Sequence, residues 1–145
     1  GGAEPVGAPH STPMLKTYPG ICHCGAVRFE ADLDLSHPTS GCHCSFCRRR
    51  RFWVAVARDG GLRVLAGEQE LTRYVFNTRR NEHFFCRHCG VRAFGVGNDT
   101  PIGRMYGVNV GCLDLTDEEM SRLSVTRVDG LNDRPDRAPE FFAHL

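Results

Sequence analysis

Eight cysteines in clusters constrain this 145-residue chain more than any other feature of its sequence. They occur as Cys22 and Cys24; Cys42, Cys44 and Cys47; Cys86 and Cys89; and Cys112 alone. A disulfide scaffold distributes its partners over several loops, because bridged Cα atoms must lie about 4.4 to 6.8 Å apart. Closely spaced cysteines instead suit a tetrahedral metal ion, since both thiolates of a Cys-x-Cys or Cys-x-x-Cys turn can bind it. The spacing therefore favours zinc, with disulfides and free buried thiols as the alternatives.

Two of the clusters are followed directly by glycine, Gly25 and Gly90. Glycine tolerates the positive φ that turns backbone N–H groups toward nearby sulfurs. Such donors matter because four thiolates on one Zn²⁺ carry a net charge of about −2, which a small core cannot hold alone. We therefore expect one closed, structural zinc site, formed by Cys22, Cys24, Cys86 and Cys89. This site should contribute on the order of 10 kcal/mol of apparent folding energy.

The middle cluster supplies three thiolates, Cys42, Cys44 and Cys47, on one short segment. Three protein ligands leave a tetrahedral ion with one open position, as in catalytic zinc sites. A fourth side chain could instead close the site, and the candidates are Cys112, His23, His43, His83 and His88. Iron is a further alternative, because thiolates also suit iron. The sequence thus predicts two zinc ions per chain, of which the second is more easily lost.

Arginines follow this three-cysteine segment directly. Residues 42–58 contain five arginines, four of them consecutive at 48–51, and no carboxylate. With three thiolates and one Zn²⁺ this stretch carries about +4, which predicts a local anion-attracting surface. A solvated basic stripe is the alternative. The whole chain has 18 basic and 17 acidic residues, so dedicated nucleic-acid binding is not expected.

Short apolar segments separated by turns predict a mainly β fold in one small domain at 16–145, after a flexible arm at 1–15. Candidate strands lie at 27–31, 52–57, 62–66, 71–77, 83–86, 91–95, 104–110 and 124–129. The sequence Asp59-Gly60-Gly61 is a hairpin-turn signal between the second and third of them. One short helix is expected near 117–123, because Thr116 and Glu119 form a capping-box pattern.

The chain has no segment typical of membrane insertion or export. No apolar run approaches the roughly 18 residues that a membrane helix needs. Residues 1–20 also lack the apolar stretch of a secretory signal. We therefore expect a cytoplasmic protein that does not span a membrane, and the sequence makes no prediction of its oligomeric state.

Taken together, the cysteine motifs resemble those of the glutathione-dependent formaldehyde-activating enzyme and centromere protein V domain family. The resemblance covers residues 20–131. It rests on Cys22-x-Cys24-Gly25-x-Val27, Cys42-x-Cys44-x-x-Cys47-Arg48, Phe85-Cys86-x-x-Cys89-Gly90 and Asn109-Val110-Gly111-Cys112-Leu113-Asp114. It implies a twisted, mostly antiparallel β-tent fold, in which the four-cysteine zinc is structural and the three-cysteine zinc is the working site.

The activity that the resemblance implies is a carbon–sulfur lyase or synthase reaction. Zinc lowers the pKa of an incoming thiol, and the thiolate can then add to an aldehyde carbonyl. Glutathione and formaldehyde would give S-(hydroxymethyl)glutathione. Arg48 would hold carboxylates of the thiol, Phe46 would line the pocket, and Asn109 would lie near it. A strand-end asparagine that satisfies backbone groups is the alternative reading of Asn109.

Other residues of the expected pocket are less specific. Phe52 and Trp53 could line it, although core packing is their more common role. No general acid or base is evident, and His43 and His83 are the candidates. The competing function is a non-catalytic zinc module whose basic segment binds protein or nucleic acid. Base stacking would need exposed rings along a charged groove, and the chain offers one short basic run.

Overall fold

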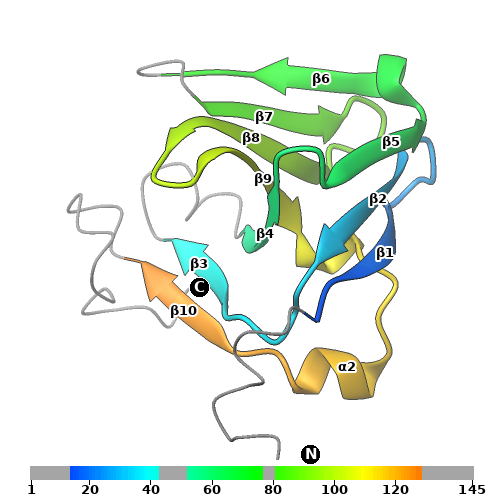
Figure 1. Ribbon diagram of the computed structural model, residues 1–145. Helices are drawn as coiled ribbons and strands as arrows, with labels where there is room; N and C mark the ends of the chain where they lie inside the picture. Colours follow the sequence, from blue (N-terminus) through cyan, green and yellow to red (C-terminus); the bar gives the residue numbers. More distant parts are fainter. Residues whose placement is uncertain (1–13, 43–51, 77–80, 129–145) are drawn as a thin grey trace, which may run out of the picture.

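The computed structural model describes residues 14–42, 52–76 and 81–128 (Figure 1). Its strands are β1 (Lys16–Ile21), β2 (Arg28–Leu33), β3 (Thr39–Cys42), β4 (Trp53–Arg58), β5 (Leu62–Ala66), β6 (Leu71–Tyr74), β7 (Asn81–Cys86), β8 (Arg92–Thr100), β9 (Gly103–Asn109) and β10 (Val125–Val128). The 3-10 turns η2 (Glu68–Glu70) and η3 (Val110–Cys112) and the helix α2 (Asp117–Ser121) complete the described elements. The predicted mainly β fold with one short helix is confirmed.

The strands form two sheets. A three-stranded sheet has the order β1-β2-β5, and a seven-stranded sheet has the order β10-β3-β4-β9-β8-β7-β6. Neighbouring strands are antiparallel, as expected, except that β10 runs parallel to β3. The parallel pair arises because the chain passes through α2 before β10 returns beside β3 (Figure 1).

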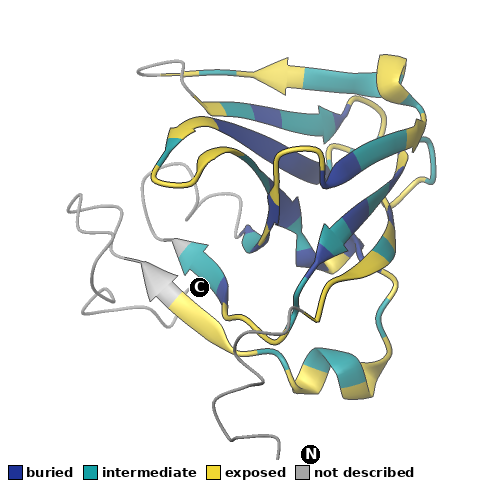
Figure 2. Ribbon diagram, in the orientation of Figure 1, coloured by how far each residue is buried: buried dark blue, intermediate teal, exposed yellow. Residues whose placement is uncertain are grey.

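The core lies between the two sheets (Figure 2). In β2 the residues alternate between exposed or half-buried and buried, so Phe29, Ala31 and Leu33 point inward. The ring of Phe29 meets that of Phe94 from β8 edge-on at 6.2 Å, and Phe84 from β7 stacks on Phe94 at 5.1 Å. The contact of Phe29 with Phe94 joins the two sheets, and such aromatic pairs stabilise packing beyond the area that they bury.

All eight predicted strands overlap observed ones, but two observed strands were not predicted. Strand β1 is mostly exposed and contains Pro19 and Gly20, so it lacks the apolar alternation that marks a half-buried strand. Strand β3 consists of the small residues Thr-Ser-Gly-Cys. Its pairing with β4 and β10 comes from the tertiary fold, which a local pattern does not predict.

The hairpin predicted at Asp59-Gly60-Gly61 is wrong. The turn itself is present, because the N–H of Gly61 donates to the carbonyl of Arg58 at 2.8 Å. However, the turn joins β4 of the larger sheet to β5 of the smaller one, and β5 pairs with β2. Turn residues predict that the chain reverses direction, but they do not predict which strand the next one will pair with. The sequence pattern therefore missed that the chain passes from one sheet to the other here.

The helix prediction is confirmed. Thr116 Oγ1 accepts from the N–H of Glu119 at 3.0 Å, and Glu119 Oε1 accepts from the N–H of Thr116 at 3.0 Å. The helix ends at Ser121, two residues before the predicted end. Within the described residues, no helix has the length and apolar character needed to cross a membrane. The predicted N-terminal arm lies almost entirely outside the described residues.

Candidate metal centre

The structure brings together the four cysteines predicted to form one site, Cys22, Cys24, Cys86 and Cys89. Their sulfurs all lie within 4.8 Å of one another. Cys22 and Cys24 Sγ are 3.7 Å apart, and Cys24 and Cys86 Sγ are 3.6 Å apart. Tetrahedral zinc with Zn–S bonds of about 2.3 Å places its sulfurs about 3.8 Å apart. The cluster therefore has the donor set and the size of a closed zinc site.

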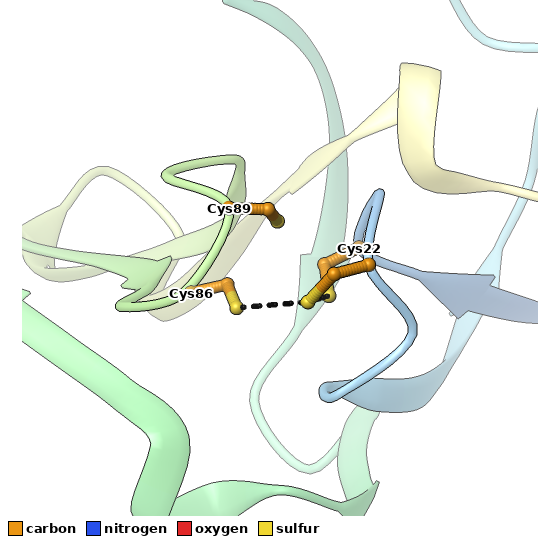
Figure 3. Close-up of side chains that lie close together, drawn as sticks. Cys22, Cys86 and Cys89 are labelled. Carbon is orange, nitrogen blue, oxygen red and sulfur yellow. Dashed lines mark hydrogen bonds between the residues drawn. The ribbon is translucent and has the colours of Figure 1, made fainter.

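The cluster joins the two sheets (Figure 3). Cys22 and Cys24 lie in the turn that follows β1, in the three-stranded sheet. Cys86 is the last residue of β7, and Cys89 lies in the turn that leads to β8, in the seven-stranded sheet. An ion held here would connect residues that are more than sixty positions apart in the chain. Because the unfolded chain has no such site, the binding free energy of the ion would stabilise the folded state.

Backbone N–H groups point at the sulfurs, as predicted. The N–H of Val27 donates to Cys22 Sγ at 3.4 Å. Further N–H donors to the sulfurs are Gly25 to Cys22, Ala26 to Cys24, and Val91 to Cys89. Both turns require glycine, because Gly25 has φ 86° and Gly90 has φ 76°. These donors would offset the negative charge that four thiolates leave on one divalent ion.

The four thiols influence each other's ionisation. Burial opposes ionisation of Cys89, but N–H groups and neighbouring thiols outweigh it and lower the pKa of Cys89 to about 6. The N–H of Ala26 favours the thiolate of Cys24, yet burial and the other three thiols raise the pKa of Cys24 to about 11. Four thiolates therefore do not coexist here at neutral pH without a cation. A divalent ion supplies that charge and displaces the remaining protons.

Cys112 lies outside the cluster. Its thiol is buried and donates to the carbonyl of Arg92 at 3.7 Å. Burial, together with the nearby Cys22 and Cys89, raises the pKa of Cys112 to about 11. Among the described residues, Cys112 is therefore a buried, hydrogen-bonded thiol that does not belong to the four-cysteine cluster.

Two histidines named as possible fourth ligands have other contacts. His88 Nε2 is 2.8 Å from Glu70 Oε2 at the surface. His83 is buried and stacks on the ring of Phe76, with ring centroids 5.5 Å apart. Neither belongs to a metal-ligand cluster among the described residues. The choice between an open and a closed second site stays a prediction.

The three-cysteine segment starts at Cys42, the last residue of β3, and continues through residues 43–51, which lie outside the described residues. The predicted ligands Cys44 and Cys47, the predicted substrate residues Phe46 and Arg48, and the candidate base His43 all fall there. The strands at both ends of the segment are described, and Gly41 of β3 pairs with Trp53 of β4. The segment therefore connects two neighbouring strands of the larger sheet.

Asn109 lies beside this connection, because it pairs with Val54 of β4. Its Nδ2 donates to the carbonyl of Arg92 at 2.7 Å, and its Oδ1 accepts from the N–H of Gly111 at 2.9 Å. These are the backbone contacts expected of a strand-end asparagine, and the second one caps η3. The predicted contact of Asn109 with substrate stays a prediction.

Sequence reasoning missed Arg92. This arginine is buried, and its guanidinium carbon lies 3.6 Å from the ring centroid of Phe52, the first described residue after the three-cysteine segment. Arginine is seldom buried, so a single arginine among apolar strand residues gave no signal. Phe52 is 7% exposed and Trp53 Nε1 donates to Thr39 Oγ1 at 2.7 Å. Both aromatic residues pack against neighbouring elements.

A cavity of about 760 Å³ lies between the end of β2, the loop that follows it, and β4. Its walls include Leu33, Asp34, Ala55, Asp59 and Ile102. No cysteine and no predicted substrate residue of the described part of the chain lines it. Among the described residues, this cavity therefore coincides with none of the predicted site residues.

Comparison with known proteins defines the class of this protein. The model of the family described as glutathione-dependent formaldehyde-activating enzyme matches residues 17–125. The chain belongs to this family, as its cysteine motifs suggested.

A curated protein and a solved structure are similar to this chain. A Halomonas elongata protein named "Putative glutathione-dependent formaldehyde-activating enzyme" is 31% identical over 78 residues. The match covers 48% of this chain and 50% of that protein, so the chain spans about half the length of this curated relative. A crystal structure of a Rhodobacter sphaeroides protein is 39% identical, with a TM-score of 0.65, over 74% of this chain and 99% of the other.

Proposed function

We propose that this protein is a carbon–sulfur lyase or synthase that joins a small thiol such as glutathione to a reactive aldehyde such as formaldehyde. The observation that carries the proposal is the family match, which spans all three cysteine clusters at residues 17–125. The geometry of the four-cysteine cluster supports it, because a closed site there leaves Cys42, Cys44 and Cys47 for a second ion.

The donor set of the three-cysteine segment fits zinc. Three thiolates satisfy three tetrahedral positions and leave one for a further ligand. When bound there, zinc lowers the pKa of a thiol and so makes its thiolate available at neutral pH. We assign the binding of this second, more easily lost ion to Cys42, Cys44 and Cys47.

The reaction needs no oxidant or reductant. The S–H bond of the thiol and the π bond of the aldehyde carbonyl break, a carbon–sulfur bond forms, and the proton moves to the former carbonyl oxygen. The chain's own residues bind and orient the reactants. We assign carboxylates of the thiol to Arg48, a wall of the pocket to Phe46, and a position near the reactants to Asn109.

The chemistry also favours a reducing location. Seven cysteines are assigned to metal binding, and a metal ligand must be a thiolate and not half of a disulfide. Cytoplasmic conditions keep thiols reduced, so we propose that the protein acts there.

The test measures catalysed exchange between free and thiol-bound formaldehyde by NMR, using zinc-loaded protein. We expect wild-type protein to accelerate this exchange. Cys44→Ser should lower the acceleration about 100-fold or more, because even residues behind metal ligands contribute about 10- to 100-fold. Cys112→Ser is the matched control, since Cys112 is a cysteine outside the proposed ligands.

A wild-type protein that holds both zinc ions and does not accelerate the exchange would contradict the proposal. If that protein also retards nucleic acid in a strongly salt-dependent manner, the basic segment serves binding instead.

A further inference from the structure

We propose that Cys24 is the redox-sensitive thiol of the four-cysteine cluster: a hydroperoxide oxidises it first, and it then forms a disulfide with Cys86, so that the cluster releases its zinc. The inference goes beyond the proposed function and does not depend on it. The observation that suggests it is a difference in exposure among sulfurs that all lie within 4.8 Å of one another. Cys24 is exposed and Cys89 is half-buried. Cys22 and Cys86 are buried.

Solvent reaches the turn that carries Cys24. Ile21, at the end of β1, is 40% exposed. Among the described residues, a Cβ on Gly25 would meet one atom within 4 Å beyond its chain neighbours, Ile21 Cδ1 at 3.8 Å. The oxidation of a cysteine increases with the exposure of its sulfur and with its thiolate character. A small oxidant can therefore approach Cys24 in the folded protein.

The other three sulfurs are less accessible. Cys86 is 0% exposed and Cys22 is 3% exposed, and both belong to the core. Cys89 is half-buried and packs against the same core. All four cysteines would be thiolates on one ion, so their exposure and not their protonation distinguishes them. The first attack therefore falls on Cys24.

Cys86 is the partner that the geometry favours. Its Sγ lies 3.6 Å from that of Cys24, and Cys22 Sγ lies 3.7 Å from it, so both are near enough. A disulfide of about 2.05 Å needs the two sulfurs to approach by roughly 1.5 Å. Cys22 and Cys24 are separated by one residue, so a bond between them closes a small ring whose strain makes it easily reduced. Cys86 is distant in the chain, and its bond with Cys24 closes no such ring.

The oxidation balances with one hydroperoxide per disulfide. The thiolate of Cys24 attacks the peroxide, the O–O bond breaks, and Cys24 becomes a sulfenic acid while the leaving oxygen takes up a proton. The thiolate of Cys86 then attacks the sulfur of Cys24, the S–S bond forms, and the S–O bond breaks. The hydroxide that leaves takes up a second proton and becomes water. The two sulfurs together lose two electrons, and the peroxide gains them.

The disulfide removes two of the four ligands, so Cys22 and Cys89 alone no longer form a closed site. The new bond joins the turn after β1 to the end of β7, and it therefore links the two sheets where the ion had linked them. We expect the melting temperature to fall in the order zinc-loaded, oxidised zinc-free and reduced zinc-free protein. Reductant and zinc together should restore the first of these states.

The test treats zinc-loaded protein with hydrogen peroxide, alkylates the remaining thiols and maps the disulfides by mass spectrometry of tryptic peptides. Cleavage after lysine and arginine places Cys24 in the peptide 17–28, Cys86 in 81–87 and Cys89 in 88–92. We expect the first cross-link of the cluster to join 17–28 to 81–87, with fragmentation showing that Cys24 and not Cys22 takes part. The cross-link should appear together with the release of zinc, which a coloured chelator measures.

Two histidine variants test the role of exposure, because three cysteines and one histidine also form structural zinc sites. Both carry Cys44→Ser, which removes a proposed ligand of the second ion, so that the measured zinc comes from the four-cysteine cluster. Cys24→His should slow the peroxide-driven release of zinc about tenfold or more, since it removes the exposed sulfur. Cys89→His is the matched control and should release zinc as fast as the Cys44→Ser parent.

Zinc release from Cys24→His as fast as from the parent would overturn the inference. Release of zinc without a cross-link between 17–28 and 81–87, or a first cross-link elsewhere in the cluster, would overturn it as well. If a histidine variant does not bind zinc, the peptides of wild-type protein decide between these outcomes. The proposed function is tested separately by formaldehyde exchange, which none of these measurements reports, so the two can fail independently.

Discussion

Cys89 and Cys112 show how strongly the surroundings change one kind of side chain. Partial burial opposes ionisation of Cys89, but neighbouring N–H groups and thiols outweigh it and lower the pKa of Cys89 to about 6. Burial and the nearby Cys22 and Cys89 raise the pKa of Cys112 to about 11. Cys89 belongs to the four-cysteine cluster, whereas Cys112 is a buried thiol outside it, so substitution of these two residues should have very different effects.

We expect Cys89→Ser to lose one zinc per chain and most of its folded structure, because a structural zinc site contributes on the order of 10 kcal/mol. Metal analysis and a thermal melt measure both effects. Cys112→Ser should keep its zinc and change stability by about 1 kcal/mol, because a hydroxyl can still donate to the carbonyl of Arg92. Equal behaviour of the two variants would contradict the assignment of Cys89.

Two substitutions of Asn109 can distinguish a structural role of its side chain from a contact with substrate. Asn109→Ala removes both amide contacts, to Arg92 and to Gly111, and should cost about 1 to 3 kcal/mol in urea unfolding. Asn109→Asp keeps the acceptor for the N–H of Gly111 but places a carboxylate oxygen against the carbonyl of Arg92, so we expect it to lose stability as well. A loss of activity in Asn109→Asp that exceeds its loss of folded protein would support the predicted substrate contact. Full activity in stable Asn109→Asp would exclude a need for its amide donor.

Among the elements, the pairing of β2 with β5 depends on one arginine. Arg63 of β5 donates to Glu30 Oε1 at 2.8 Å and to Asp32 Oδ1 at 2.9 Å, both on β2. Thr17 of β1 also donates to Asp32, at 2.6 Å. Hydrogen bonds from Arg63 and Thr17 lower the pKa of Asp32 to about 2 from its usual 3.8. All three strands of the small sheet therefore meet at this carboxylate.

This shift gives a pH dependence with a defined sign. Because the pKa of Asp32 is lower in the folded protein, its stabilising contribution is present above about pH 4 and is lost as the pH falls toward 2. Asp32→Asn should be less stable than wild type at pH 7, and the difference should shrink toward pH 2. Urea unfolding at several pH values measures it. A difference that does not depend on pH would contradict the account, and high salt should reduce it because the pair is partly exposed.

The observed strands, helix and cysteine cluster also show how much of the structure could be predicted from the sequence. The capping box at Thr116 and the alternation at Phe29 and Ala31 are local patterns. The first correctly predicted the helix α2, and the second correctly predicted the strand β2. The grouping of Cys22 with Cys86 was also predictable, because ligand number and geometry link distant pairs. The transfer of the chain from β4 to the small sheet at Gly60 depends on packing between sheets, so no local pattern reports it. Arg92 was missed for a similar reason, since its guanidinium occupies the space over Gly95, which exists only in the folded sheet.

At the scale of the whole molecule, the four-cysteine cluster connects the two sheets. Removal of its zinc should therefore unfold both sheets and not only the cysteine turns. Trp53, the only tryptophan, lies on β4 and reports on the larger sheet. With a strong chelator, we expect the change in Trp53 fluorescence to coincide with the loss of β circular dichroism. Fluorescence that stays native after the last zinc has left would show that the larger sheet folds without the cluster.

The central claim is that the three-cysteine segment holds zinc with one open position, which a thiol can occupy. X-ray absorption at the zinc edge measures the average number of sulfur ligands in fully loaded protein. One four-sulfur and one three-sulfur site give about 3.5 sulfurs per zinc, and glutathione should raise this average to about 4. One zinc per chain with about 4 sulfurs, or two zincs whose sulfur number glutathione does not change, would contradict the account.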